Sequence, residues 1–184
     1  GYLNVTVAPL PALLKDAGYN TYMAGKWHMG EEPDHYPAAR GFMRDFTLIP
    51  GGGSHMDDMW GAKGERQLYT KNGKPIQALR PGFYSSEDYT ASIIENIDEN
   101  RADGKPFFVY LALQAPHDPF QLPDNWLDRY KGRYDAGYDA TRADRMAGRR
   151  GARGVPRAEA AVFLLLALAL VWLRPRRHER KIWS

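Results

Sequence analysis

The sequence predicts an α/β fold, in which helices alternate with strands of a mainly parallel sheet. Two strand-like segments, residues 19–27 and 107–113, each follow a segment with helical periodicity. Each also leads directly into a polar loop that carries a histidine. In open α/β sheets, functional sites lie beyond the carboxyl ends of the strands, so we expect the chemistry in these two loops. Apolar residues make up 43% and aromatic residues 12% of the chain, which excludes a disordered protein.

The first half of the chain predicts one helix, one strand and one hairpin. A short amphipathic helix spans residues 9–17, with a proline at its start and a glycine after its end. The strand over residues 19–27 follows. Residues 38–82 read as irregular, except that Asn72-Gly73 between residues 67–69 and 75–76 predicts a tight β-hairpin.

A longer helix and the most apolar strand follow. Ser85 or Ser86 is the expected cap of a helix that ends near Arg101, with its buried face formed by Tyr89, Ile93, Ile94 and Ile97. Residues 107–113 form a continuous apolar run, which predicts a strand covered on both faces. Asp124-Asn125 reads as a loop that enters a helix at Trp126.

The charge pattern divides the chain near residue 145. Residues 1–140 carry 14 basic against 19 acidic side chains, whereas residues 141–184 carry 11 against 3. We therefore expect a domain over residues 1–145 and an unrelated basic tail over residues 146–184. The apolar run 160–173 in that tail predicts a short helix, but it is shorter than the roughly 20 residues that span a bilayer.

Three interpretations of the tail stay open. A shifted reading frame or misjoined sequence is favoured, because the composition changes abruptly and arginine dominates the basic residues. A short membrane-associated helix with basic flanks comes second. A nucleic-acid-binding arm comes last, because lysine and aromatic residues are not interleaved with the arginines, and we expect no nucleic-acid partner.

Lys26 and His28 stand at the end of the first strand, in the run Gly-Lys-Trp-His-Met-Gly. Residues two apart on a strand point to the same side. Lysine offers a compact positive charge for an anion, and histidine can move a proton near neutral pH. Taken alone, the pattern more often marks a surface lysine beside a solvated histidine.

His117 follows the second strand, in the run Ala-Pro-His-Asp-Pro. Two prolines stiffen the loop and fix the direction of the imidazole, which suits a general acid. By itself the pattern also fits a rigid turn with an incidental histidine. The runs His55–Asp58 and Glu31–His35 contain metal-ligand types, but both read as solvated loops. There is no phosphate-binding Gly-rich loop and no Gly-x-Ser-x-Gly elbow.

From these two loops outward, the sequence resembles the type I sulfatases, and especially the bacterial arylsulfatases. Besides Gly-Lys-Trp-His-Met-Gly, the resemblance includes the preceding run from Leu10 to Ala24. It then continues through residues 39–42, 84–90, 105–108 and 114–117 in the family's order. Such a resemblance implies an alkaline-phosphatase-like α/β/α sandwich, of which residues 1–145 would be a part. The implied activity is hydrolysis of sulfate esters of sugars, aryl groups or other small molecules.

The resemblance also implies roles and cofactors. Lys26 and His28 would hold the sulfate and a formylglycine nucleophile, and His117 would protonate the leaving oxygen. A divalent ion, Ca²⁺ by the family's pattern, would sit beside the formylglycine. The Cys- or Ser-x-Pro-x-Arg motif that yields formylglycine is absent, and with it the family's metal ligands. We expect the motif and the paired aspartates of the metal site to lie upstream of Gly1 and the downstream Asp-Asn pair to lie outside this chain as well, and we expect the 184-residue chain alone to be inactive.

Two other functions stay open at this point. One is a phosphonate or phosphodiester hydrolase of the same superfamily. The other is a non-catalytic sulfatase-like protein held at a membrane by residues 160–173. The chain has no cysteine, which excludes disulfides and thiolate metal sites but leaves the compartment open. Periplasmic or secreted locations follow from the resemblance alone, and a cytoplasmic one fits the residues equally.

Overall fold

The computed structural model describes residues 1–61 and 63–152 and forms two compact units, residues 1–128 and residues 129–184. The first unit contains the sheet. The second contains α4 (Gly137–Ala152), which the sequence pattern did not predict. The expected boundary at residue 145 falls inside α4, and the apolar run 160–173 lies outside the described residues, so both stay predictions. None of the helices described is long and apolar enough to cross a membrane.

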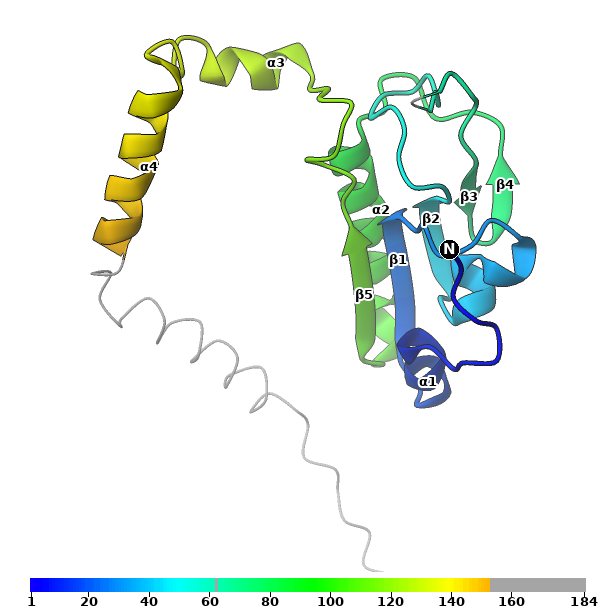
Figure 1. Ribbon diagram of the computed structural model, residues 1–184. Helices are drawn as coiled ribbons and strands as arrows, with labels where there is room; N and C mark the ends of the chain where they lie inside the picture. The colour runs from blue at the N-terminus through cyan, green and yellow to red at the C-terminus, as the bar shows by residue number, and fades with distance from the viewer. Residues whose placement is uncertain (62, 153–184) are drawn as a thin grey trace, which may run out of the picture. The chain divides into compact units, whose positions relative to one another are not determined.

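A five-stranded sheet with the order β4-β3-β2-β1-β5 forms the centre of the first unit (Figure 1). The strands β1 (Asn20–Lys26), β2 (Arg44–Leu48) and β5 (Phe107–Ala112) are parallel, with β1 between the other two. The strands β3 (Tyr69–Lys71) and β4 (Lys74–Ile76) add an antiparallel hairpin beyond β2. The α/β prediction is confirmed.

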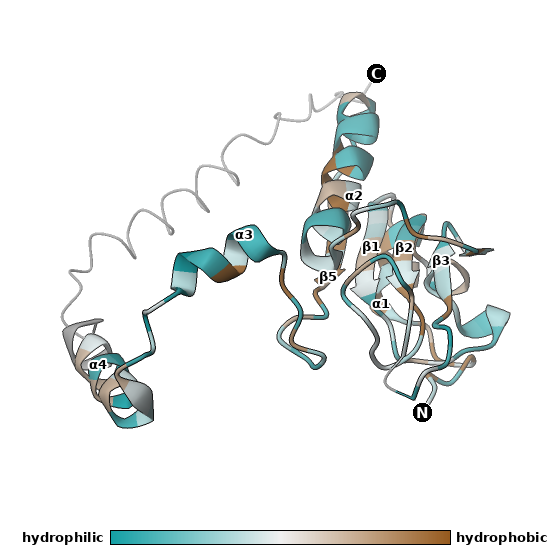
Figure 2. Ribbon diagram, turned by 90° about the horizontal axis from the view of Figure 1, so that it is seen from above, coloured by the Kyte–Doolittle hydropathy of each residue, from teal (hydrophilic) through white to brown (hydrophobic). Residues whose placement is uncertain are grey.

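Helices cover both faces of this sheet. The long helix α2 (Ser85–Asn100) packs on one face and the short helix α1 (Leu10–Asp16) lies on the other (Figures 1 and 2). Because side chains alternate along a strand, β1 contributes Tyr22 and Ala24 to the core beneath α2 and Met23 to the opposite core. The remaining short elements are η1 (Pro33–His35), η2 (Pro37–Arg40), η3 (Arg101–Asp103), α3 (Asp124–Leu127) and η4 (Asp128–Tyr130).

The hairpin prediction is confirmed, but the irregular reading of residues 38–82 was wrong about β2. At the hairpin turn, Asn72 and Gly73 have φ angles of 51° and 74°, as a two-residue turn with left-handed residues requires. The missed strand β2 begins with two charged residues, Arg44 and Asp45, so its composition does not indicate a strand. Asp45 is nevertheless 1% exposed, because the hairpin folds over it.

Asp45 joins β2 to the hairpin through a network of buried hydrogen bonds. Its carboxylate accepts hydrogen bonds from the Thr70 hydroxyl at 3.0 Å, the Thr47 hydroxyl at 3.3 Å and the Gly73 amide at 2.8 Å. The two hydroxyls also lie 2.8 Å apart. The hydroxyls of Thr47 and Thr70 therefore supply two protons for three oxygen–oxygen contacts: one from each hydroxyl to Asp45 and one between the two hydroxyls. Burial raises the pKa of Asp45, and these hydrogen bonds oppose that rise without cancelling it.

The start of α2 differs from the prediction. The cap position is Tyr84, and neither Ser85 nor Ser86 makes a capping hydrogen bond. Instead, the Asp88 carboxylate accepts the Tyr84 amide at 2.9 Å, a reach-back contact from the first turn. Ile94 was also wrongly assigned to the buried face, because its side chain is 54% exposed.

Three more expectations need correction at the surface. The strand β5 lies at the edge of the sheet, so Phe107 and Tyr110 are 52% and 40% exposed rather than covered. In α1, the apolar residues Leu10 and Leu13 are also more than half exposed. The helix expected from Trp126 begins at Asp124.

Candidate functional site

Three parallel strands end at the same edge of the sheet, and the loop after each contributes to the candidate site. The register pairs Gly25 with both Thr47 of β2 and Ala112 of β5. The segments that follow are therefore neighbours: residues 27–30 after β1, 49–55 after β2 and 113–121 after β5. The expectation that both histidine-bearing loops lie beyond the carboxyl ends of parallel strands is confirmed.

Gly25 permits the close approach of β1 and β5 next to this edge. Its φ angle is 116°, and a Cβ atom on it would lie 1.9 Å from the carbonyl oxygen of Ala112. No other residue fits there without separating the two strands. The glycine of the Gly-Lys-Trp-His run is thus required by packing, and it fixes where the chain leaves the sheet.

The side chains after Gly25 divide between the core and the surface. Trp27 is 5% exposed, and its indole N–H donates to the carbonyl of His35 at 2.8 Å. Of its two neighbours in the sequence, Lys26 is half-buried and His28 is exposed. Among the described residues, the Lys26 ammonium has no hydrogen bond or ion pair, so its charge is available to an anion.

His28 has a left-handed backbone, with a φ angle of 55°. Its amide donates to the carbonyl of Ile49 at 3.0 Å, which ties this conformation to the loop after β2. Non-glycine residues adopt such a backbone uncommonly, and when they do, functional sites are a frequent setting.

The imidazoles of His28 and His117 lie against two consecutive glycines. A Cβ atom on Gly51 would lie 2.6 Å from Cε1 of His28, so that ring occupies the space of the missing side chain. A Cβ atom on Gly52 would lie 3.5 Å from Cε1 of His117. The loop after β2 therefore places the imidazoles of His28 and His117 against two adjacent residues, Gly51 and Gly52.

His117 is oriented by the residue that follows it. Its Nδ1 lies 2.7 Å from the carbonyl oxygen and 2.9 Å from the carboxylate of Asp118. Because neither oxygen can donate, Nδ1 carries a proton and Nε2 is left for proton transfer. The side chain is 51% exposed, so a ligand can reach it. Asp118 is a candidate positioning residue that sequence reasoning did not single out.

The loop His55–Asp58 is not the solvated loop that the sequence suggested. Asp57 and Asp58 are exposed, but His55 is 2% exposed and fully hydrogen-bonded. Its Nδ1 lies 2.8 Å from Oγ of Ser85 and its Nε2 lies 3.1 Å from the carbonyl oxygen of His117. The second acidic loop agrees with the prediction at Glu31, Glu32 and Asp34, which are exposed, but not at His35, whose side chain is 14% exposed.

The described residues do not provide a metal centre. No group of three or more His, Cys, Asp or Glu side chains in residues 1–61 and 63–152 is arranged to hold an ion. The ligands that the resemblance implies for a divalent ion are not among these residues, so the chemistry below is derived without one.

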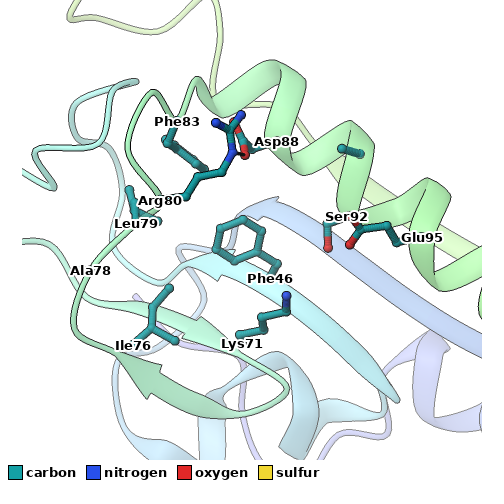
Figure 3. Close-up of a pocket in the computed structure, with 11 residues that line it drawn as sticks. Phe46, Lys71, Ile76, Ala78, Leu79, Arg80, Phe83, Asp88, Ser92 and Glu95 are labelled. Carbon is teal, nitrogen blue, oxygen red and sulfur yellow. Dashed lines mark hydrogen bonds and ion pairs between the residues drawn. The ribbon is translucent and has the colours of Figure 1, made fainter.

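One cavity of about 400 Å³ lies away from the three candidate residues, between α2 and the β3–β4 hairpin (Figure 3). Phe46 and Phe83 contribute apolar surface. Lys71 lies with its ammonium 6.0 Å from the centre of the Phe46 ring. The Arg80 guanidinium donates two hydrogen bonds, of 2.5 and 2.9 Å, to the carboxylate of Asp88, and is thereby held at the start of α2. None of Lys26, His28 and His117 lines this cavity.

Comparisons with known proteins agree with the sheet and its loops. The family model described as Sulfatase matches residues 2–172. An uncharacterised sulfatase of Schizosaccharomyces pombe is 42% identical over 154 residues, covering 79% of this chain and 27% of that protein. The arylsulfatase of Klebsiella aerogenes is 40% identical over 144 residues, covering 77% of this chain and 31% of the enzyme.

Among solved structures, Ps i-CgsB in complex with k-i-k-neocarrahexaose superimposes with a TM-score of 0.62 at 26% identity. The match covers 71% of this chain and 31% of that one. The chain thus spans about a third or less of the relatives it matches. From the family match, the two relatives and the shared fold, it follows that this chain belongs to the sulfatase family.

Proposed function

We propose that the protein hydrolyses sulfate esters and that this chain supplies the anion-binding and proton-donating side of the active site. One observation carries the proposal: His28 and His117 lie against adjacent glycines, beyond strands whose ends also present the Lys26 ammonium, which has no partner among the described residues. Sulfatases act on sulfated sugars or other sulfated small molecules, so the expected substrate is a sugar or aryl sulfate.

The proposed roles follow from the chemistry of each side chain. The Lys26 ammonium neutralises charge on the sulfate oxygens, which is most valuable where water is excluded. His28 contacts the same group and can accept a proton as sulfate is released. In its imidazolium form, His117 keeps the proton on Nδ1 and donates the one on Nε2 to the ester oxygen as the S–O bond breaks, so the organic product leaves as a neutral alcohol or phenol.

The nucleophile lies outside these residues. Sulfatases generally depend on a metal ion and formylglycine, but this sequence has no cysteine and no Ser-x-Pro-x-Arg run, and the described residues have no metal cluster. The Ca²⁺ ion and formylglycine implied by the resemblance therefore remain proposals for the whole protein, and no step is assigned to them.

The test uses protein expressed from the complete gene and compares sulfate with phosphorus esters. We expect release of 4-nitrophenol from 4-nitrophenyl sulfate, with kcat/KM reduced roughly 100-fold or more in Lys26→Ala. In His117→Ala we expect a loss of that size for an alkyl sulfate, whose leaving oxygen needs a proton. Lys63→Ala, an exposed lysine of the loop after β2, serves as the matched control and retains wild-type rates.

Two results would oppose the proposal. Faster cleavage of a phenylphosphonate monoester or of bis(4-nitrophenyl) phosphate would favour the superfamily alternative. No turnover of any ester, together with partitioning into detergent, would favour a non-catalytic membrane-associated protein. Sequencing the gene across both ends of this chain and through codon 147 decides whether residues 146–184 are read in the correct frame.

A further inference from the structure

We propose that His55 is a positioning residue, which holds the backbone of residue 117 against the start of α2 and so fixes where the His117 imidazole points. The inference deepens the proposed function, because it assigns a support to the proton donor. His55 itself is 2% exposed and cannot reach a substrate.

The His55 imidazole bridges two segments that are distant in sequence. On one side, Nε2 lies 3.1 Å from the carbonyl oxygen of His117. On the other, Nδ1 lies 2.8 Å from the hydroxyl of Ser85, the first residue of α2. The backbone repeats this link, because the Ser85 amide donates to the His55 carbonyl at 2.9 Å. The loop is thus attached to the first residue of the 16-residue helix α2.

The partners determine the tautomer. A carbonyl oxygen only accepts hydrogen bonds, so Nε2 of His55 must be the donor. In the neutral ring Nδ1 is then the acceptor, and the Ser85 hydroxyl donates to it. This use of the Ser85 hydroxyl explains why Ser85 does not cap α2 as the sequence suggested.

Among the described residues, four hydrogen bonds join the loop after β2 to the loop after β5, and the one from the His55 ring to the His117 carbonyl lies between the others along the second loop. At the beginning, the Gln114 side-chain amide donates to the carbonyl of Gly53. At the end, Oε1 of Gln121 accepts the His55 amide at 2.8 Å and the Ser54 hydroxyl at 3.1 Å. Residue 117 lies between these two attachments.

The side-chain contacts of His117 do not fix the position of its ring relative to the rest of the fold. Within the described part of the chain, its hydrogen bonds reach only Asp118, the next residue in the same loop, and half of its surface is exposed. The ring therefore points where its backbone carries it. Among the described residues, the His117 backbone makes two hydrogen bonds: its amide donates to the Gln114 carbonyl, and its carbonyl accepts from the His55 ring.

The first test needs no catalytic activity and uses the 184-residue chain labelled with ¹⁵N-histidine. Long-range ¹H–¹⁵N spectra should show His55 as the Nε2–H tautomer. In His55→Leu, we expect the His117 ring signals to shift and its amide to exchange at least about 10-fold faster, with β1 amides unchanged. His55→Gln retains an N–H at about the same place and should restore slow exchange.

Two serines provide a matched pair. Ser85→Ala removes the hydroxyl that Nδ1 contacts and should loosen residue 117 in the same direction as His55→Leu. Ser86→Ala, whose hydroxyl has no hydrogen bond among the described residues, should resemble the wild type. If His55→Leu does not fold, His55→Gln and Ser85→Ala still decide the question. An Nδ1–H tautomer, or His117 signals that are the same in Ser85→Ala as in Ser86→Ala, would overturn the proposal.

The second test links the restraint to proton donation in the protein from the complete gene. An alkyl sulfate needs a proton on its leaving oxygen, whereas 4-nitrophenolate leaves readily without one. We expect His55→Leu to slow the alkyl sulfate roughly 100-fold and 4-nitrophenyl sulfate less than 10-fold. Equal losses on both esters would indicate a purely structural role for His55. Absence of sulfatase activity would remove the proposed function but leave the spectroscopic test standing.

Discussion

Gly51→Ala tests whether the candidate site has the geometry described, because it places a methyl group where the His28 ring now lies. That methyl would be 2.6 Å from Cε1 and 2.7 Å from Nε2 of His28. Carbon atoms in ordinary contact stay about 3.5–4.0 Å apart, so the ring must move by roughly 1 Å. The backbone of Gly51 is outside the left-handed region, so alanine itself is not strained there.

The expected result is a folded protein with a displaced histidine. A glycine-to-alanine change at a compatible position stabilises by roughly 0.4–1 kcal/mol through the unfolded state, which offsets part of the local crowding. A displacement of about 1 Å in a reacting group costs roughly 100-fold in rate. We therefore expect an unfolding midpoint near the wild-type value, shifted His28 ring signals, and kcat/KM for 4-nitrophenyl sulfate lowered about 100-fold.

Gly52→Ala is the matched control. Its methyl would lie 3.5 Å from Cε1 of His117, which is ordinary contact. We expect its kcat/KM to stay within about threefold of the wild-type value, because no reacting group has to move. The reasoning fails if Gly51→Ala and Gly52→Ala have the same histidine spectra and the same rates.

Three further substitutions test the fold. Because burial raises the pKa of Asp45 above its ordinary value of 3.8, the folded state holds the proton more tightly than the unfolded state. The contribution of Asp45 to the free energy of unfolding is therefore largest below pH 3.8 and is lost as pH rises through the folded-state pKa. Urea titrations at several pH values should show that loss in the wild type and not in Asp45→Asn, and identical profiles would contradict the assignment. Asp88→Ala removes the carboxylate that accepts the Tyr84 amide at the start of α2, and thermal unfolding should show a loss of roughly 1–2 kcal/mol, against less than about 0.5 for a surface control. Gly25→Ala should destabilise more than Gly18→Ala. Both glycines have positive φ angles, but of the two only Gly25 has a neighbour that the added Cβ atom would meet, the Ala112 carbonyl oxygen at 1.9 Å. Equal losses would mean that backbone strain alone is responsible.

Local sequence patterns located most of the regular elements because those patterns are local. The turn at Asn72-Gly73, the glycine after α1 and the apolar run of β5 each depend on neighbouring residues alone. The histidines at positions 28 and 117 were recognisable as candidates for the same reason. Each follows directly from a strand that the hydrophobic pattern reveals.

The strand β2 was missed because its residues do not have a strand's usual composition. Asp45 is buried only because Thr70 and Gly73, more than 20 residues away in sequence, donate hydrogen bonds to it. Missing β2 also meant missing the loop after it. Had β2 been recognised, its carboxyl end would have placed residues 49–55 at the site edge, next to the loops after β1 and β5.

By itself, the sequence determined the α/β class, the family, and the residue types that can bind an anion and donate a proton. Each of these depends on short runs whose meaning does not require distant partners. Only the tertiary structure decided that His55 is buried, that Ser85 bonds an imidazole instead of capping a helix, and that Gly51 and Gly52 bring two histidines together. The physical reason is that burial and hydrogen-bond partners arise from contacts between segments 30 to 62 residues apart, which no local pattern encodes.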